Sequence, residues 1–165
     1  MKRIRYNRVV FVIVVLITIV SLLLYLYYHQ NYFYEYDGDI QTYVCSYQQD
    51  KKIYTFDLKG FQIDEENYVS LNDLYNVIVI MDEKAHVYMQ VHKHMMVYEL
   101  SDITYYFHYG QDRIVYNNDC IKLKDYDSHI YISHKNVYIN VFFIEKLLFN
   151  NEKKIKFQNE NAIIE

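Results

Sequence analysis

The segment "YVSLNDLYNVIVIMDEKAHVYM", residues 68–89, predicts a short strand, a helix and a second strand in succession. Its centre has hydrophobic residues at three-to-four-residue spacing, which places them on one face of a helix. Ser70 directly precedes them, where its hydroxyl can accept a backbone N–H of the first turn. Asp73 follows at the third helical position, as in a capping box. We therefore predict a helix that starts after Ser70 and buries Leu71, Leu74, Val77 and Ile78.

A similar segment occurs 70 residues later. Tyr138 matches Tyr68, and Asn140 takes the place of Ser70 as the helix cap. Chemically similar residues at a fixed spacing indicate an internal repeat, so we expect two βα units packed on each other. The second helix is expected to bury Val141, Ile144, Leu147 and Leu148.

Strands are predicted on either side of these helices. Residues 40–47 alternate in character and place Tyr43, Cys45 and Tyr47 on one face, and residues 51–60 alternate up to a turn at Gly60. The predicted fold class is α+β, with two βα-type repeats whose short amphipathic helices pack on small sheets. The first repeat is expected over residues 40–100 and the second over residues 101–165.

The N-terminal region predicts a membrane anchor. Residues 9–28 carry no formal charge and are long enough to span a bilayer as a helix. The basic residues before them, in residues 1–8, predict a cytoplasmic N-terminus, and residues 29–39 would form a juxtamembrane segment. A cleaved signal peptide fits less well, because tyrosines follow instead of small residues. We therefore expect a single-pass protein of the cell membrane, with the lipid bilayer as a partner and the C-terminal part extracellular.

Charge and composition restrict the partners of the remaining chain. It holds 21 acidic and 13 basic residues, a net charge of −8, which argues against nucleic acid as a partner. The chain has no proline, three glycines and 21 tyrosines, a composition that needs burial and excludes a flexible tail.

Two cysteines leave two alternatives open. Cys45 and Cys120 are too few for a disulfide scaffold and too far apart for a metal-binding CxxC pattern. They either pair with each other or remain as separate thiols, because sequence does not show whether their Cα atoms come within about 7 Å.

Motifs for catalysis are missing from these 165 residues. The sequence has no glycine-rich phosphate loop, no nucleophile elbow and no HExxH. The acidic run Asp64, Glu65 and Glu66 predicts a turn, and its side chains diverge instead of facing one another across a cleft. We therefore predict no catalytic residue and no cofactor.

One weak metal-site candidate remains. On a continuous strand, His92 and His94 would share a face and offer two imidazoles to a metal, with Met95 and Met96 as soft donors for Cu(I). A third and a fourth ligand are not evident, so a solvent-exposed strand face is the favoured interpretation and no metal site is predicted.

The aromatic run over residues 105–109 has two interpretations. Aromatic faces can stack on sugar rings, which would make this run a carbohydrate-binding surface. In a chain with 21 tyrosines, the run is also typical of core packing.

The repeated segments resemble the copper amine oxidase N-terminal-like domain, also called a stalk domain. The similarity lies in "YVSLNDLYNVI" with "MDEKAHVYM", and in "VYINVFFIEKLL" with "NEKKIKF", over roughly residues 40–165. The family motif has a proline where this chain has Ser70 and Asn140, and an arginine where it has Asn72 and Phe142.

The resemblance implies a noncatalytic module. Similar regions precede the catalytic domains of membrane-anchored family 18 glycoside hydrolases in the cell wall of Gram-positive bacteria. The chain is thus expected to be a stalk or docking module of a bacterial cell envelope, with a catalytic domain possible beyond Glu165. The alternatives are a binding module for wall glycan or for another envelope protein and, after these, a histidine-based metal-binding protein. The oligomeric state stays open.

Overall fold

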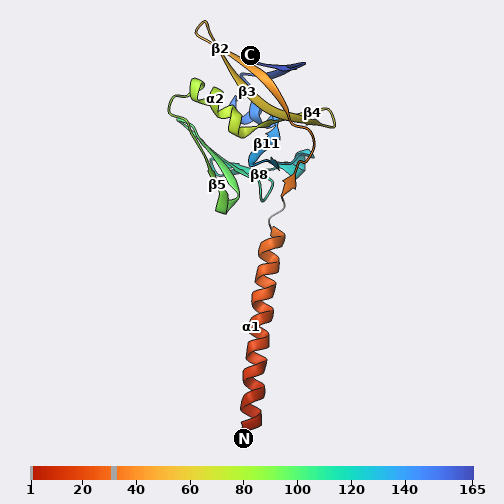
Figure 1. Cartoon of the computed structure of the whole chain (residues 1–165). Helices are drawn as coiled ribbons and strands as arrows, with labels where there is room; N and C mark the ends of the chain where they lie inside the picture. Colours follow the sequence, from red (N-terminus) through yellow and green to blue (C-terminus); the bar gives the residue numbers. More distant parts are fainter. Residues whose placement is uncertain (1, 31–32) are drawn as a thin grey trace. The chain divides into compact units, whose positions relative to one another are not determined.

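The computed structural model describes residues 2–30 and 33–165. Within residues 2–30, side chains are described for residues 10–26. The chain divides into two compact units, residues 1–32 and residues 33–165 (Figure 1). Each unit is described by itself below. The predicted segments over residues 1–8 and 29–39 lie partly outside the described residues.

The first unit contains one helix, α1 (Lys2–Gln30). Over the residues that the structure describes, no helix combines the length and the apolarity that crossing a membrane requires. This finding contradicts the predicted membrane anchor over residues 9–28, and with it the single-pass topology and the cell-membrane location.

The second unit is built from two sheets. The larger sheet has eight strands in the order β1 (Tyr34–Glu35), β10 (Tyr131–Ser133), β11 (Asn136–Asn140), β4 (Glu66–Ser70), β3 (Lys52–Ile63), β2 (Gln41–Gln49), β13 (Asn161–Ile164) and β12 (Ile155–Gln158). The smaller sheet has five strands in the order β5 (His86–Gln90), β6 (Met95–Glu99), β7 (Thr104–His108), β8 (Arg113–Tyr116) and β9 (Asp119–Lys122).

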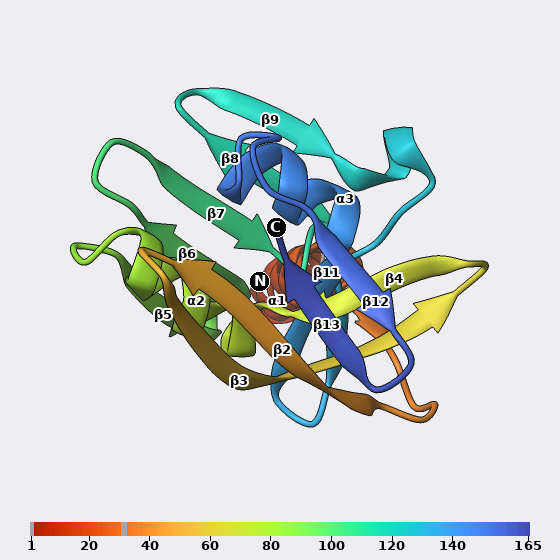
Figure 2. The same ribbon diagram turned by 90° about the horizontal axis from the view of Figure 1, so that it is seen from above.

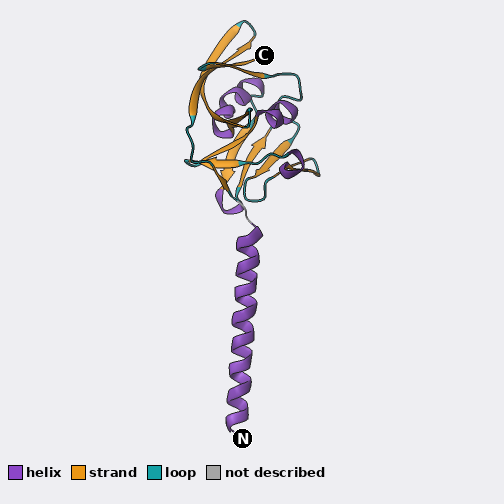
Figure 3. Cartoon of the chain, turned by 90° about the vertical axis from the view of Figure 1, so that its right-hand side faces the viewer, coloured by secondary structure: helices purple, strands orange, loops and turns teal. Residues whose placement is uncertain are grey.

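The helices lie between these sheets (Figures 2 and 3). They are α2 (Leu71–Met81) and α3 (Val141–Phe143) with its π-helical continuation η3 (Ile144–Leu148). Two short 3-10 turns lie in connections of the smaller sheet: η1 (Val91–Lys93) joins β5 to β6, and η2 (Leu123–Tyr126) follows β9. One buried cluster joins helix residues such as Leu74 to Val69 and Cys45 of the larger sheet and to Phe107 of the smaller sheet. The predicted fold class, with short helices on small sheets, is therefore wrong: two large sheets enclose the helices, and buried side chains of both helices and both sheets belong to one cluster.

Both predicted helix starts are confirmed. The Ser70 hydroxyl accepts the backbone N–H of Asp73 at 3.2 Å, and all four predicted residues of α2 are buried. The Asn140 side-chain oxygen accepts the backbone N–H of Phe142 at 2.9 Å. Three of the four predicted residues in the second helix are buried, and Val141 is half-buried.

The two repeats meet at matching positions. Strands β4 and β11 pair in antiparallel register with Val69 opposite Ile139, and both of these side chains are fully buried. Val69 and Ile139, which are 70 residues apart, thus face each other, and a local two-fold axis relates the two strands. Strand pairs β6–β7 and β2–β13 also join the two halves, so residues 33–165 form one compact unit.

Gly60 does not end a strand. Strand β3 continues through it to Ile63, with Gly60 paired to Gln41 on one side and to Val69 on the other. A Cβ atom at Gly60 would lie 2.5 Å from the backbone oxygen of Tyr68. The glycine is therefore required by the close approach of two strands, and the prediction of a turn at this residue is wrong.

Four hairpins turn without glycine. The two residues between β2 and β3, β3 and β4, β8 and β9, and β10 and β11 all have positive φ. This geometry matches the right-handed twist of the strands, and asparagine and aspartate adopt it more readily than most residues. The turn residues are Asp50 and Lys51, Asp64 and Glu65, Asn117 and Asn118, and His134 and Lys135.

Candidate functional site

The histidines considered as metal ligands lie in a hairpin turn. His92 is exposed in η1, and His94 has a left-handed backbone with a φ of 52° directly before β6. The expected continuous strand is therefore broken, and the two side chains do not share a strand face. The His94 ring packs edge-on against Phe33, with 4.9 Å between centroids. Over the described residues, no three His, Cys, Asp or Glu side chains come together in a way that could hold a metal ion.

The two cysteines lie in different sheets and are free thiols. Cys45 is buried in β2, on the face that it shares with Tyr43 and Tyr47, whereas Cys120 is exposed on β9. Burial raises the pKa of the Cys45 thiol to about 12. Since the thiolate is the reactive form, Cys45 is inert at neutral pH.

We expect one thiol to react in the native chain. A maleimide reagent should label Cys120 at neutral pH and leave Cys45 unlabelled, because Cys45 is both buried and protonated. Mass spectrometry would record one adduct in buffer and two in denaturant, and Cys120→Ser should remove the native adduct. Two adducts in the native protein would contradict the placement of Cys45.

The aromatic run over residues 105–109 belongs to the core. Tyr105, Phe107 and Tyr109 are buried, and the Tyr105 hydroxyl donates a 2.8 Å hydrogen bond to the backbone oxygen of Leu147. Tyr98 on the neighbouring strand donates in the same way to the backbone oxygen of Leu71, and burial raises the pKa of both tyrosines. These hydroxyl groups hydrogen-bond both helices to the smaller sheet. The burial of Tyr105, Phe107 and Tyr109 therefore favours the core interpretation over sugar stacking.

Acidic side chains tie elements to one another. Asp73 of α2 accepts the backbone N–H of Lys59 in β3 at 3.0 Å. Glu145 of η3 accepts the backbone N–H of Ile155 in β12 at 2.8 Å. In the turn predicted over residues 64–66, Glu66 accepts a hydrogen bond from the Asn140 side chain. Each carboxylate thus satisfies a donor from another element.

A polar pair that the sequence did not reveal lies beside the larger sheet. The Asp112 carboxylate is 2.6 Å from His129 Nδ1, and its other oxygen accepts the backbone N–H of Ile130 at 2.7 Å. The Tyr34 ring stacks on the His129 ring at 3.8 Å between centroids. A carboxylate bound to Nδ1 orients an imidazole, as in general-base sites, and here it also fixes the loop before β10. Seventeen residues separate the pair, so no spacing signal marked it.

The outer aromatic face of the larger sheet is covered by the chain itself. Phe61, Tyr68 and Tyr138 are buried there, and the Tyr36 ring stacks on Phe61 with 3.7 Å between centroids. The backbone N–H of Tyr36 donates to the oxygen of Ile132, which extends the pairing of β1 with β10. The segment that follows residue 33 therefore closes a second, smaller core.

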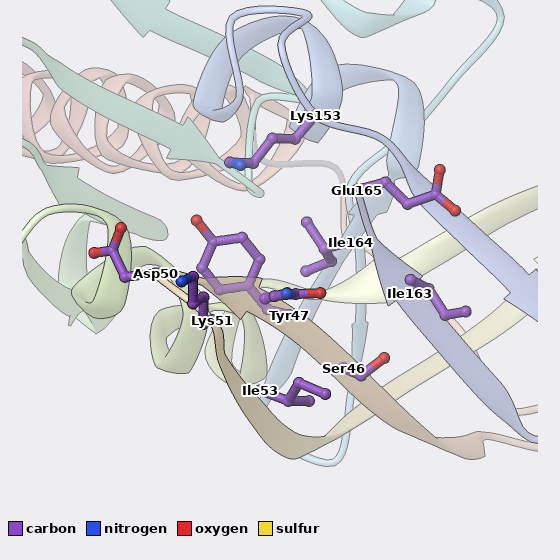
Figure 4. Close-up of a pocket in the computed structure, with 10 residues that line it drawn as sticks. Ser46, Tyr47, Asp50, Lys51, Ile53, Lys153, Ile163, Ile164 and Glu165 are labelled. Carbon is purple, nitrogen blue, oxygen red and sulfur yellow. The ribbon is translucent and has the colours of Figure 1, made fainter.

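A surface pocket lies at the hairpin of β2 and β3. Its volume is about 460 Å³, and Figure 4 shows Tyr47, Lys51 and Lys153 among the residues that line it. Lys153 Nζ lies 4.9 Å from the centre of the Tyr47 ring, an interaction that holds the segment before β12 over β2.

An exposed pair of aromatic rings lies at the contact between η2 and α3. Tyr126 is 46% exposed and Phe142 is 48% exposed, and their ring centroids are 6.1 Å apart. Lys146 Nζ lies 5.3 Å from the Tyr126 ring and 5.5 Å from the Phe142 ring. We call Tyr126, Phe142 and Lys146 the aromatic platform. It combines large apolar surface with a polar tip and a cation, which is typical of binding surfaces.

Comparison with known proteins finds no matching family model, no similar curated protein and no similar solved structure. The resemblance of the two repeats to the copper amine oxidase N-terminal-like domain therefore stays a prediction.

Proposed function

We propose that this chain is a noncatalytic stalk or docking module that holds or spaces another component. The observation that carries this proposal is the separation of β1 and β13 across the larger sheet of the second unit. Strand β1 forms one edge of the eight-stranded sheet, and β13 lies next to the strand at the other edge. Six strand spacings separate them, about 29 Å along the sheet.

The way in which the chain uses its polar groups supports this proposal. Asp73, Asp112 and Glu145 each accept a backbone N–H from a separate segment. The buried hydroxyls of Tyr98 and Tyr105 donate to helix carbonyls. Hydrogen bonds of this kind stabilise the fold and make the region between the two edges of the larger sheet rigid. The resemblance of the repeats to stalk domains points in the same direction.

The test is site-specific photo-crosslinking in the cells that express the protein. A photoreactive residue replaces Val44 or Ile53, which are 50% and 70% exposed on the outer face of β2 and β3. A docking module should form a discrete adduct of defined mass from this face. Lys84, exposed in the loop after α2, is the control position. The same scan in a Leu74→Ala background should lose the adduct, because the variant weakens the fold on which the surface depends.

Two results together would overturn the proposal. The first is that no position on this face forms a discrete adduct. The second is that the purified chain turns over a glycan or peptide substrate and that His129→Ala abolishes this turnover. His129 and Asp112 form the one pair in the described structure with the geometry of an oriented general base, so this variant addresses the enzymatic alternative directly.

A second candidate function is glycan binding, which the aromatic platform favours. The sequence placed this function on residues 105–109, where the rings are largely buried. The exposed rings lie instead at Tyr126 and Phe142.

A further inference from the structure

The aromatic platform is built on a buried ring. Phe143 is 1% exposed, and its ring contacts Phe142 at 5.2 Å and Tyr126 at 5.5 Å between centroids, both edge-on. The two exposed rings therefore both pack on one core side chain, and the Lys146 ammonium group lies near both rings. Rings that are held in place before binding lose little conformational freedom when a ligand stacks on them.

The repeat shows that the fold does not need an exposed ring at this place. Phe142 occupies the position of Asn72 in the first repeat, 70 residues earlier. Asn72 points inward, where its side-chain oxygen accepts the backbone N–H of Val137 at 3.1 Å. Phe142 instead leaves about half of its surface in water, at a cost in hydrophobic burial. The repeat therefore folds without an aromatic ring at this position, and the exposed Phe142 ring is left free to contact a ligand.

The charges around the platform indicate the chemistry of the ligand. Lys124, Asp125 and Asp127 flank Tyr126 in the sequence and are exposed. Among the described residues, Lys146 forms no ion pair. The platform is thus surrounded by both positively and negatively charged side chains, which can donate or accept hydrogen bonds. The net charge of the second unit is negative. Such a surface disfavours a polyanion and suits a neutral ligand with many hydroxyl groups, each of which can donate and accept.

We propose that Tyr126 and Phe142 bind a neutral saccharide by stacking on the C–H face of its sugar ring. The negative faces of the aromatic rings attract the positively polarised C–H groups, and the surrounding charged side chains hydrogen-bond the hydroxyl groups at the rim. The aromatic platform is exposed and shallow, so it accepts a residue within a chain as well as a chain end. This proposal rests on the glycan-binding candidate, for which it names the ligand class and the binding residues, and it does not depend on the stalk or docking role.

The test is titration of the full chain with neutral oligosaccharides, chitotetraose and cellotetraose, followed by ligand-observed NMR. We expect saturable binding of at least one of them. Tyr126→Ala and Phe142→Ala should each weaken binding about tenfold, since each removes one of the two aromatic faces on which the sugar stacks. Lys146→Ala should weaken binding less than the loss of either ring, because a neutral sugar keeps its stacking contacts without the charge.

The matched control is Tyr75→Ala. Tyr75 is an exposed tyrosine of α2, 41% accessible, and its removal should leave binding unchanged. Thermal unfolding of each variant shows whether the fold is retained. Absence of binding to both oligosaccharides would overturn the proposal, as would equal binding by a folded variant that lacks both rings. A loss confined to Lys146→Ala, with binding of hyaluronan in place of neutral sugars, would assign an anionic ligand instead. The crosslinking result for Val44 and Ile53 is independent of each of these outcomes.

Discussion

Replacing Leu74 with alanine is expected to lower the free energy of unfolding by about 2–5 kcal/mol. Leu74 is fully buried on α2 and belongs to the core that joins both sheets. Its truncation removes apolar contacts and leaves a cavity between layers that other strands hold apart, so the space cannot collapse completely. Urea unfolding followed by circular dichroism would measure the change.

The control for this measurement is the next residue on the same helix. Tyr75 is 41% exposed, and Tyr75→Ala should change the free energy of unfolding by no more than about 0.5 kcal/mol. Both variants remove side-chain atoms at helical positions, so the difference between them reports burial. A near-zero effect for Leu74→Ala would contradict the packing of α2 between the sheets.

The second large effect is expected at Gly60. Gly60→Ala should lower the free energy of unfolding by about 1–3 kcal/mol, because its new methyl group would lie 2.5 Å from the Tyr68 backbone oxygen. That atom belongs to a strand paired on both sides and cannot rotate away as a side chain can. Strands β3 and β4 would have to separate at the centre of the larger sheet.

The sign of this effect is the decisive result. Gly60 does not have a positive φ, so alanine fits its backbone and would by itself stabilise the protein by about 0.4–1 kcal/mol through the unfolded state. Stabilisation by Gly60→Ala would therefore show that the two strands are not in close contact. Lys59→Ala, an exposed change on the same strand, serves as the control and should have an effect below about 0.5 kcal/mol.

Features that depend on neighbours in sequence were predictable. The caps at Ser70 and Asn140 and the buried face of α2 follow from residue types at helical spacing. The grouping of Tyr43, Cys45 and Tyr47 on one face of β2 follows from simple alternation. In these cases one face of an element meets the core and the other meets water, so the spacing alone shows which residues share a face.

Local features without a usual signal were missed. The β5–β6 hairpin turns at His94 without a glycine, and the four two-residue hairpins use residues such as Asp64 and Asn117 in positive-φ positions. Sequence reasoning associates such turns with glycine. The aromatic platform was missed for a different reason, because Tyr126 and Phe142 are sixteen residues apart and belong to separate elements.

By itself, the sequence determined that residues 33–165 contain two capped helices, alternating strands and a tyrosine-rich core, because each of these depends on spacing within one segment. Only the tertiary structure decided that β4 and β11 pair at matching positions and that two large sheets enclose both helices. It also decided which aromatic rings stay in water. These features depend on contacts between distant segments, and the energies of such contacts are not encoded in any single stretch of the chain.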